Sequence, residues 1–198
     1  MKRLVKIISV LIFLECCILA TLLIVPIVSG KKVLIGHISG TQLTYGVITA
    51  IFILGIVLVI VRYGGSRCRK NLIIMIAVSV ISTGALLGTC FLYLLFVAGS
   101  ETYYTFYSPD GRYSVVAEER SWLLAGSVIL YERTNPFLVE ERARLLTDDG
   151  FRAISSEAYE IWWNDNVVTF TIETTNWDQP KDTAVVILSS IQSDIPFP

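Results

Sequence analysis

The sequence predicts a membrane protein of the α + β class: three transmembrane helices followed by a small, mainly antiparallel β domain outside the cell. Three observations support this fold class. The first half holds three long apolar runs, short strand-like segments begin after Ala98, and the two halves carry opposite charges. We therefore expect a helical region over residues 1–98 and an extracytoplasmic domain over residues 99–198.

The apolar runs cover residues 7–28, 45–61 and 72–98. About 20 apolar residues in a helix cross a hydrocarbon core of about 30 Å. The first and third runs exceed this length, and the second, with about 17 residues, is at the short end of the range but carries no charge. We expect all three to lie in the lipid bilayer. A cleaved signal peptide is the alternative for the first run, but such segments are usually shorter.

The charges of the short loops predict the orientation. The cations flanking the helices on one side number seven: Lys2, Arg3, Lys6, Arg62, Arg67, Arg69 and Lys70. The loop on the other side has two, Lys31 and Lys32. Because cytoplasmic loops are enriched in cations, we expect a multi-pass protein of the cell membrane with a cytoplasmic N-terminus and an extracytoplasmic C-terminal domain.

Glu15 is the only acidic residue of the helical region. It lies about 12 Å into the first run, near mid-membrane, where a charge is costly and often functional. Ser82 and Thr83 are expected at the same depth of the third helix. We favour a protonated Glu15 that is hydrogen-bonded to this pair. Contact with a partner helix and a proton or ion relay are the alternatives.

Small residues form a stripe on the third helix. Gly84 and Gly88 are four residues apart, with Ala85 and Thr89 beside them. Small side chains at this spacing let two helix backbones approach closely. We expect the stripe to pack against one of the chain's own helices, with contact to another chain as the alternative.

The second half alternates between β-forming segments and turn residues. Residues 108–111, Ser-Pro-Asp-Gly, predict a turn, because proline presets φ and glycine accepts a positive φ. Strands are expected at 112–119, 127–133, 159–163, 167–173 and 183–188. Residues 137–146 fit either a strand or a short helix.

Residues 159–173 predict a hairpin with a two-residue turn at Asp165-Asn166. This register pairs Trp163 with Val168, Ile161 with Phe170, and Tyr159 with Ile172 on the core face. The opposite face then carries Glu160, Trp162, Thr169 and Thr171. Because a slip of one residue would invert both faces, the register is well specified. Trp162 is either exposed, as a candidate external contact for a protein or glycan, or packed beneath a loop.

The charged clusters at 118–120, 132–133 and 140–142 are expected to form cross-strand ion pairs on a solvated face. Tyr103 and Tyr104 follow the third helix directly and are expected to anchor the chain at the outer membrane interface.

No pattern in the sequence predicts catalysis, a metal site or a cofactor. His37 is the only histidine, which argues against a Ser-His-Asp triad and against zinc sites built from several histidines. Asp148-Asp149-Gly150 lacks the spacing of a calcium loop. All four cysteines lie before residue 99, so the external domain has no disulfide, which suits a bacterial surface. A domain with sixteen acidic and seven basic residues would also repel nucleic acid.

The sequence resembles small membrane-anchored proteins of unknown function from Gram-positive bacteria. The resemblance rests on Ser-Pro-Asp-Gly-Arg-Tyr at 108–113 and Trp-Asn-Asp-Asn-Val at 163–167, and it covers residues 106–173. It implies N-terminal helices joined to a short external β domain. Ser-Pro-Asp-Gly also opens strands in β-propeller blades, but this domain has the length for barely two blades. No functional residue carries over from these proteins.

These observations favour a non-enzymatic accessory, sensory or immunity-type envelope protein. We expect it to act through contacts of its external domain and helices with another membrane or envelope protein. The alternative is a small subunit of a membrane transporter, with Glu15 in the translocation path.

Overall fold

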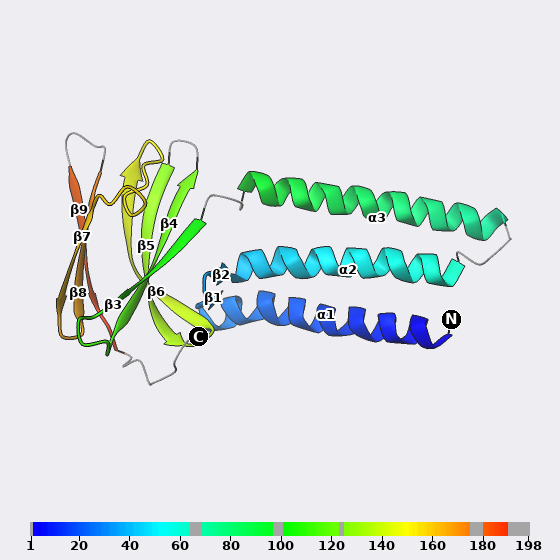
Figure 1. Ribbon diagram of the computed structural model, residues 1–198, viewed down its shortest axis with the longest axis horizontal. Coiled ribbons are helices and arrows are strands. Elements are labelled where there is room, and N and C mark those ends of the chain that lie inside the picture. The colour runs from blue at the N-terminus through cyan, green and yellow to red at the C-terminus, as the bar shows by residue number, and fades with distance from the viewer. Residues whose placement is uncertain (1, 64–68, 97–100, 123–124, 175–179, 190–198) are drawn as a thin grey trace. The chain divides into compact units, whose positions relative to one another are not determined.

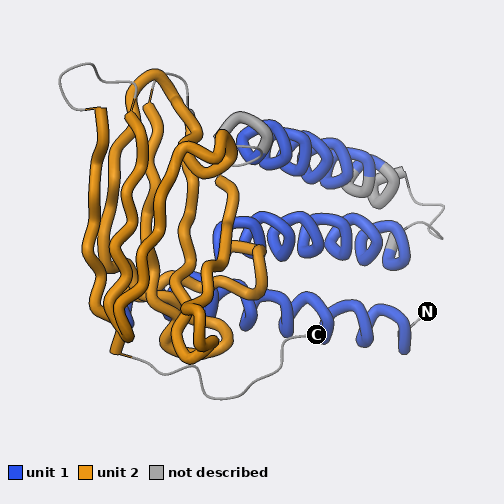
Figure 2. Tube along the Cα trace, turned by 60° about the vertical axis from the view of Figure 1, so that its left-hand side comes forward, with its two compact units in different colours: residues 1–29, 40–98 blue, residues 30–39, 99–198 orange. Residues whose placement is uncertain are grey.

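The computed structural model describes residues 2–63, 69–96, 101–122, 125–174 and 180–189. The chain divides into two compact units, and each is described by itself. Unit 1 holds residues 1–29 and 40–98, and unit 2 holds residues 30–39 and 99–198 (Figure 2). Arg67, one of the cations that predict the orientation, lies outside the described residues, as do residues 190–198.

Unit 1 contains three helices that are long and apolar enough to span a membrane. They are α1 (Lys2–Ser29), α2 (Gly40–Tyr63) and α3 (Arg69–Phe96). The prediction of three such helices is confirmed. Helix α2 begins five residues before the expected start at Tyr45, and the hydroxyl of Thr44 donates a hydrogen bond of 2.8 Å to the Gly40 carbonyl in the added turn.

The three helices lie side by side, with α2 in contact with both α1 and α3 (Figure 1). The rings of Tyr45 on α2 and Tyr93 on α3 meet edge to face, with their centroids 5.2 Å apart. Pro26 lies inside α1, near its C-terminal end. Membrane helices tolerate such a proline because neighbouring groups satisfy the freed carbonyl.

Unit 2 consists of two antiparallel sheets. The six-stranded sheet has the order β2-β1-β6-β5-β4-β3, and the three-stranded sheet has the order β7-β8-β9. The strands are β1 (Lys32–Ile35), β2 (Ile38–Ser39), β3 (Glu101–Tyr107), β4 (Ser114–Trp122), β5 (Ala125–Asn135), β6 (Leu138–Asp148), β7 (Tyr159–Asn164), β8 (Val167–Glu173) and β9 (Lys181–Ile187).

The connection between α1 and α2 is part of the large sheet. We expected a loop here, but β1 pairs with β6 and turns back into β2 through Gly36, whose φ is 61°. The side chain of Leu34 is fully buried. Strands this short gain their stability from their partners, because β1 pairs with β6 and β2 with β1, so their own sequence gives little sign of them.

Residues 108–111 form the expected turn. Gly111 has a φ of 71°, and the Ser108 hydroxyl donates to Asp110 Oδ1 at 2.6 Å. The following strand starts at Ser114 and not at Arg112. The ambiguous segment 137–146 lies almost entirely in strand β6.

The hairpin β7–β8 has the predicted register. Trp163 pairs with Val168, Ile161 with Phe170, and Tyr159 with Ile172. Asp165 in the turn has a φ of 50°, a conformation that aspartate adopts more readily than most residues.

The main core lies between the two sheets. Its fully buried members come from β4, β5, β6, β8 and β9: Val115, Ala117, Val128, Leu130, Leu145, Val168, Phe170, Ile172 and Val186. A smaller apolar cluster covers the opposite face of the large sheet: Leu34, Tyr103, Val116, Ile129, Tyr131 and Val139. The central strands of the large sheet are therefore buried on both faces.

Candidate functional site

Trp162 lies on the outer face of the small sheet, opposite the core. Its side chain is 68% exposed, which excludes the alternative of a residue packed beneath a loop. Across the sheet, Trp162 pairs with Thr169 and Thr169 with Val185, which is 63% exposed. In the next row Val167 pairs with Ile187, which is 67% exposed.

These four apolar residues, Trp162, Val167, Val185 and Ile187, are called the outer strip. Polar pairs border it on the same face. The ammonium of Lys181 lies 3.0 Å from a carboxylate oxygen of Glu160, and the hydroxyls of Thr171 and Thr183 are 3.0 Å apart. An exposed aromatic ring next to aliphatic side chains, with a polar border, is typical of a protein contact surface.

Glu118 is a buried carboxylate on β4. It lies on the face of the large sheet that points away from the core between the two sheets. Its side chain is inaccessible, and three donors surround it. The Lys32 ammonium lies 2.8 Å from Oε2, the Tyr131 hydroxyl donates to Oε2 at 2.6 Å, and the Arg120 guanidinium donates to Oε1 at 2.5 Å. Lys32 comes from β1, 86 residues before Glu118.

The electrostatics of this cluster favour the charged carboxylate. Burial raises the pKa of Glu118, but Lys32, Tyr131 and Arg120 together outweigh burial and bring that pKa below its ordinary value. Burial and the neighbouring Glu118 carboxylate raise the pKa of both Tyr103 and Tyr131. The tyrosines are therefore neutral donors at physiological pH.

Glu119 faces the other side of β4 and is also buried. Its carboxylate accepts hydrogen bonds from the backbone amides of Ile154 and Ser155, at 2.7 and 3.2 Å, and from the Ser155 hydroxyl. It holds the segment before β7 against the large sheet.

Glu132 on β5 is the third buried carboxylate. The Arg142 guanidinium contacts its Oε2 at 2.6 Å, and the backbone amide of Ser189 donates to its Oε1 at 2.6 Å. Ser189 lies two residues after the end of β9, so Glu132 holds the end of the small sheet to the large one.

These contacts correct two expectations from the sequence. Glu118, Glu119 and Glu132 are not on a solvated face, and Tyr103 is buried beside Glu118 and Lys32 and is not exposed as an interfacial anchor. The sequence does contain a sign that both faces of this strand are buried. Before Glu118 stand Val115, Val116 and Ala117, and consecutive apolar residues are typical of a strand buried on both faces.

The buried glutamates bind other parts of the chain. Each accepts at least two hydrogen bonds from donors distant in the sequence. Among the described residues, no group of three histidine, cysteine or carboxylate side chains could hold a metal ion.

Glu15 is partly exposed, and its Oε2 atom is buried without a hydrogen-bond partner among the described residues. The expected hydrogen bond from this atom to Ser82 or Thr83 is therefore not formed. The helix order explains this, because α2 lies between α1 and α3 (Figure 1).

The two glycines of the small-residue stripe of α3 lie against no other part of the chain that the structure describes. A Cβ atom added at Gly84 or at Gly88 would meet nothing within 4 Å, and both residues are exposed. The packing against α1 or α2 that we expected is thus not made at these glycines.

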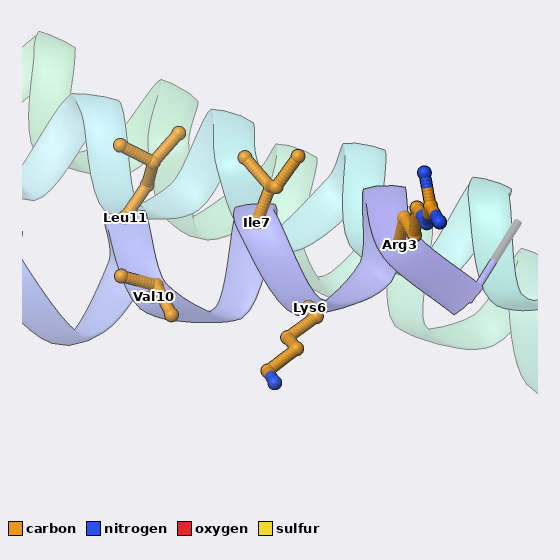
Figure 3. Close-up of a pocket in the computed structure, with 5 residues that line it drawn as sticks. All are labelled: Arg3, Lys6, Ile7, Val10 and Leu11. Atoms are coloured by element: carbon orange, nitrogen blue, oxygen red, sulfur yellow. The ribbon is translucent and has the colours of Figure 1, made fainter.

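A shallow hollow of about 410 Å³ lies near the start of α1. Arg3, Ile7 and Leu11 lie along one side of the helix at four-residue spacing, and Lys6 and Val10 also line the hollow (Figure 3). Two cations beside apolar side chains suit the boundary between lipid headgroups and acyl chains.

Comparison of the chain with protein-family models, with curated proteins and with solved structures finds no match.

Proposed function

We propose that this protein is a non-enzymatic accessory, sensory or immunity-type protein of the bacterial cell envelope. Its helices hold unit 2 at the membrane, and unit 2 contacts another membrane or envelope protein through the outer strip. The observation that carries this proposal is the exposure of Trp162 at the edge of an apolar strip that spans three strands. Large exposed aromatic residues contribute strongly to binding at protein interfaces.

A photo-crosslinking amino acid at position 162, in the full chain in native membranes, tests the contact. We expect a discrete crosslinked product that Val185→Asp abolishes, because the aspartate places a charge in the middle of the strip. Leu146 is the matched control position: it is 63% exposed but lies on the large sheet. Equal products from both positions, or none from position 162, would refute the contact.

The proposed orientation places the N-terminus in the cytoplasm and unit 2 outside. Lys6 and Asp165 are both exposed. In a chain whose own cysteines are replaced, Asp165→Cys should react with a membrane-impermeant thiol reagent in intact cells. Lys6→Cys should react only after lysis, and the opposite pattern would reverse the orientation.

A small transporter subunit is the second candidate, favoured by the buried Oε2 of Glu15, which has no hydrogen-bond partner in the described part of the chain. A relay needs a group that can release and accept a proton, whereas a hydrogen-bonding contact needs only the shape and polarity of the side chain. Glu15→Gln keeps both. Ion flux through the native complex should survive Glu15→Gln if the protein is an accessory and should collapse if Glu15 lies in the translocation path.

A further inference from the structure

The core between the two sheets is covered more completely along one side than along the other. At the β6–β9 side, Leu145, Val186 and Leu188 are 1–3% exposed, and the Leu146 amide donates to the Asp182 carboxylate at 3.2 Å. At the β3–β7 side, the core-facing residues Tyr104, Phe106, Tyr159, Ile161 and Trp163 all remain partly exposed. This second set is called the open seam.

The open seam is rich in aromatic rings that already pack on the core. Phe106 of β3 lies 5.4 Å from Tyr159 of β7, and both rings contact Phe170, at 5.5 and 5.6 Å between centroids. The apolar surface at the open seam is thus a continuation of the core, and further apolar side chains could cover it.

The backbone of β7 offers hydrogen bonds beside this surface. The backbone amide of Glu173 donates a hydrogen bond of 2.9 Å to the Ala158 carbonyl. Because every second residue of an antiparallel strand is hydrogen-bonded to its neighbour, the backbones of residues 158, 160, 162 and 164 bond to β8. The amides and carbonyls of Tyr159, Ile161 and Trp163 therefore point away from β8. Among the described strands, β7 pairs only with β8.

The charge of unit 2 indicates the chemistry of an occupant. Residues 30–39 and 99–198 carry nine basic and sixteen acidic side chains, a formal charge of −7. On the outer face of β7, Glu160 lies beside Trp162 and pairs with Lys181, so the attraction comes from the net charge of the whole unit. A neighbouring segment with basic side chains on its outer face would be attracted to this surface.

We propose that β7 is the docking edge for an extended segment of a partner protein, which adds to the small sheet as a fourth strand. Its backbone bonds to Tyr159, Ile161 and Trp163, its inward apolar side chains cover the open seam, and its outward side chains are basic. This mode of binding is β-strand addition, in which backbone bonds give affinity and alternate side chains give specificity. The inference rests on the proposed function and names the kind of partner.

Backbone amide exchange in the full chain in lipid nanodiscs tests this. The peptide added alternates valine with lysine and threonine. In the free protein, the amides of Tyr159, Ile161 and Trp163 should exchange fast and those of Glu160 and Trp162 slowly. The peptide should slow the first three by about tenfold or more, because it pairs with them. The same peptide with glutamate in place of lysine should bind about tenfold more weakly.

Three results would overturn strand addition. The amides of Tyr159, Ile161 and Trp163 could be protected in the free protein, which would mean that the edge is already occupied. The peptide could bind without slowing their exchange, or the acidic peptide could bind as tightly as the basic one. Crosslinking from position 162 is independent of all three, so the proposed contact could stand while strand addition fails.

Discussion

At the scale of single residues, Glu118 and Lys32 join two parts of the chain that are 86 residues apart. Glu118 is inaccessible and the Lys32 side chain is 19% exposed. A buried charge is tolerated only when an opposite charge and further donors satisfy it. Tyr131 and Arg120 provide those donors. Lys31, one residue earlier, forms an ion pair with Glu140 at 3.5 Å in which both side chains are about one third exposed.

Removing Lys32 should therefore be much more damaging than removing Lys31. Lys32→Met leaves Glu118 buried without its main counter-charge and should lower the free energy of unfolding by about 3–5 kcal/mol. Lys31→Met should change it by less than about 1 kcal/mol. Urea unfolding of the full chain, followed by tryptophan fluorescence, measures both. Similar losses for the two variants would show that the Glu118 cluster is not a main source of stability.

The low pKa of Glu118 predicts a loss of stability in acid. Its folded-state pKa lies below the ordinary value of 4.5, so the charged form is favoured by folding. This contribution is fully present above pH 4.5 and is lost as the pH falls through the lower, folded-state pKa. Unfolding curves measured from neutral to strongly acid pH should show the decrease, and Glu118→Gln should flatten it. An unchanged pH profile in that variant would assign the acid sensitivity to other carboxylates.

At the scale of elements, the β7–β8 hairpin has one register that satisfies every position. Phe170 is fully buried between Tyr159 and Phe106, whereas Thr169 faces outward in the same strand. The alternation along β8 separates a core face from a solvent-accessible face.

Charges placed on the two faces should therefore have opposite effects. Phe170→Asp buries an unpaired charge and removes a large apolar side chain, and it should unfold unit 2. Thr169→Asp should lower the free energy of unfolding by about 1 kcal/mol or less, since its side chain stays in solvent. Circular dichroism of the two purified variants compares them. A folded Phe170→Asp protein would contradict the register.

At the scale of the whole molecule, unit 2 is assembled from two separate stretches of sequence. Residues 30–39 lie between two apolar helices, yet they provide β1, β2, the buried Leu34 and the cation for Glu118. The expected boundary at residue 99 leaves this contribution out.

A chain of residues 99–198 alone should consequently be less stable than one in which residues 30–39 precede residue 99 through a flexible glycine–serine linker. The shorter chain leaves Glu118 without Lys32 and exposes the face that Leu34 covers. Thermal unfolding should show a clearly lower midpoint for it. Lys32→Met in the longer chain should remove most of the difference, and equal midpoints would mean that β1 and β2 add little to the fold.

The sequence by itself determined the features that depend on local pattern. Apolar length predicted the three helices, glycine and proline placed the turn at 108–111, and the alternation of residues 159–173 set the hairpin register and the outward direction of Trp162. Each of these depends on neighbouring residues, through helix rise, allowed φ values or the two-residue period of a strand.

Only the tertiary structure decided where the charged residues lie and how the helices meet. Glu118, Glu119 and Glu132 have the sequence surroundings of surface residues, and they are buried because Lys32, Ser155 and Ser189 approach them from 86, 36 and 57 residues away. Likewise, the position of α2 between α1 and α3 keeps Glu15 from Ser82 and Thr83. The pattern of residues along the sequence does not predict such contacts, because the partners are far apart in the chain and no fixed spacing relates them.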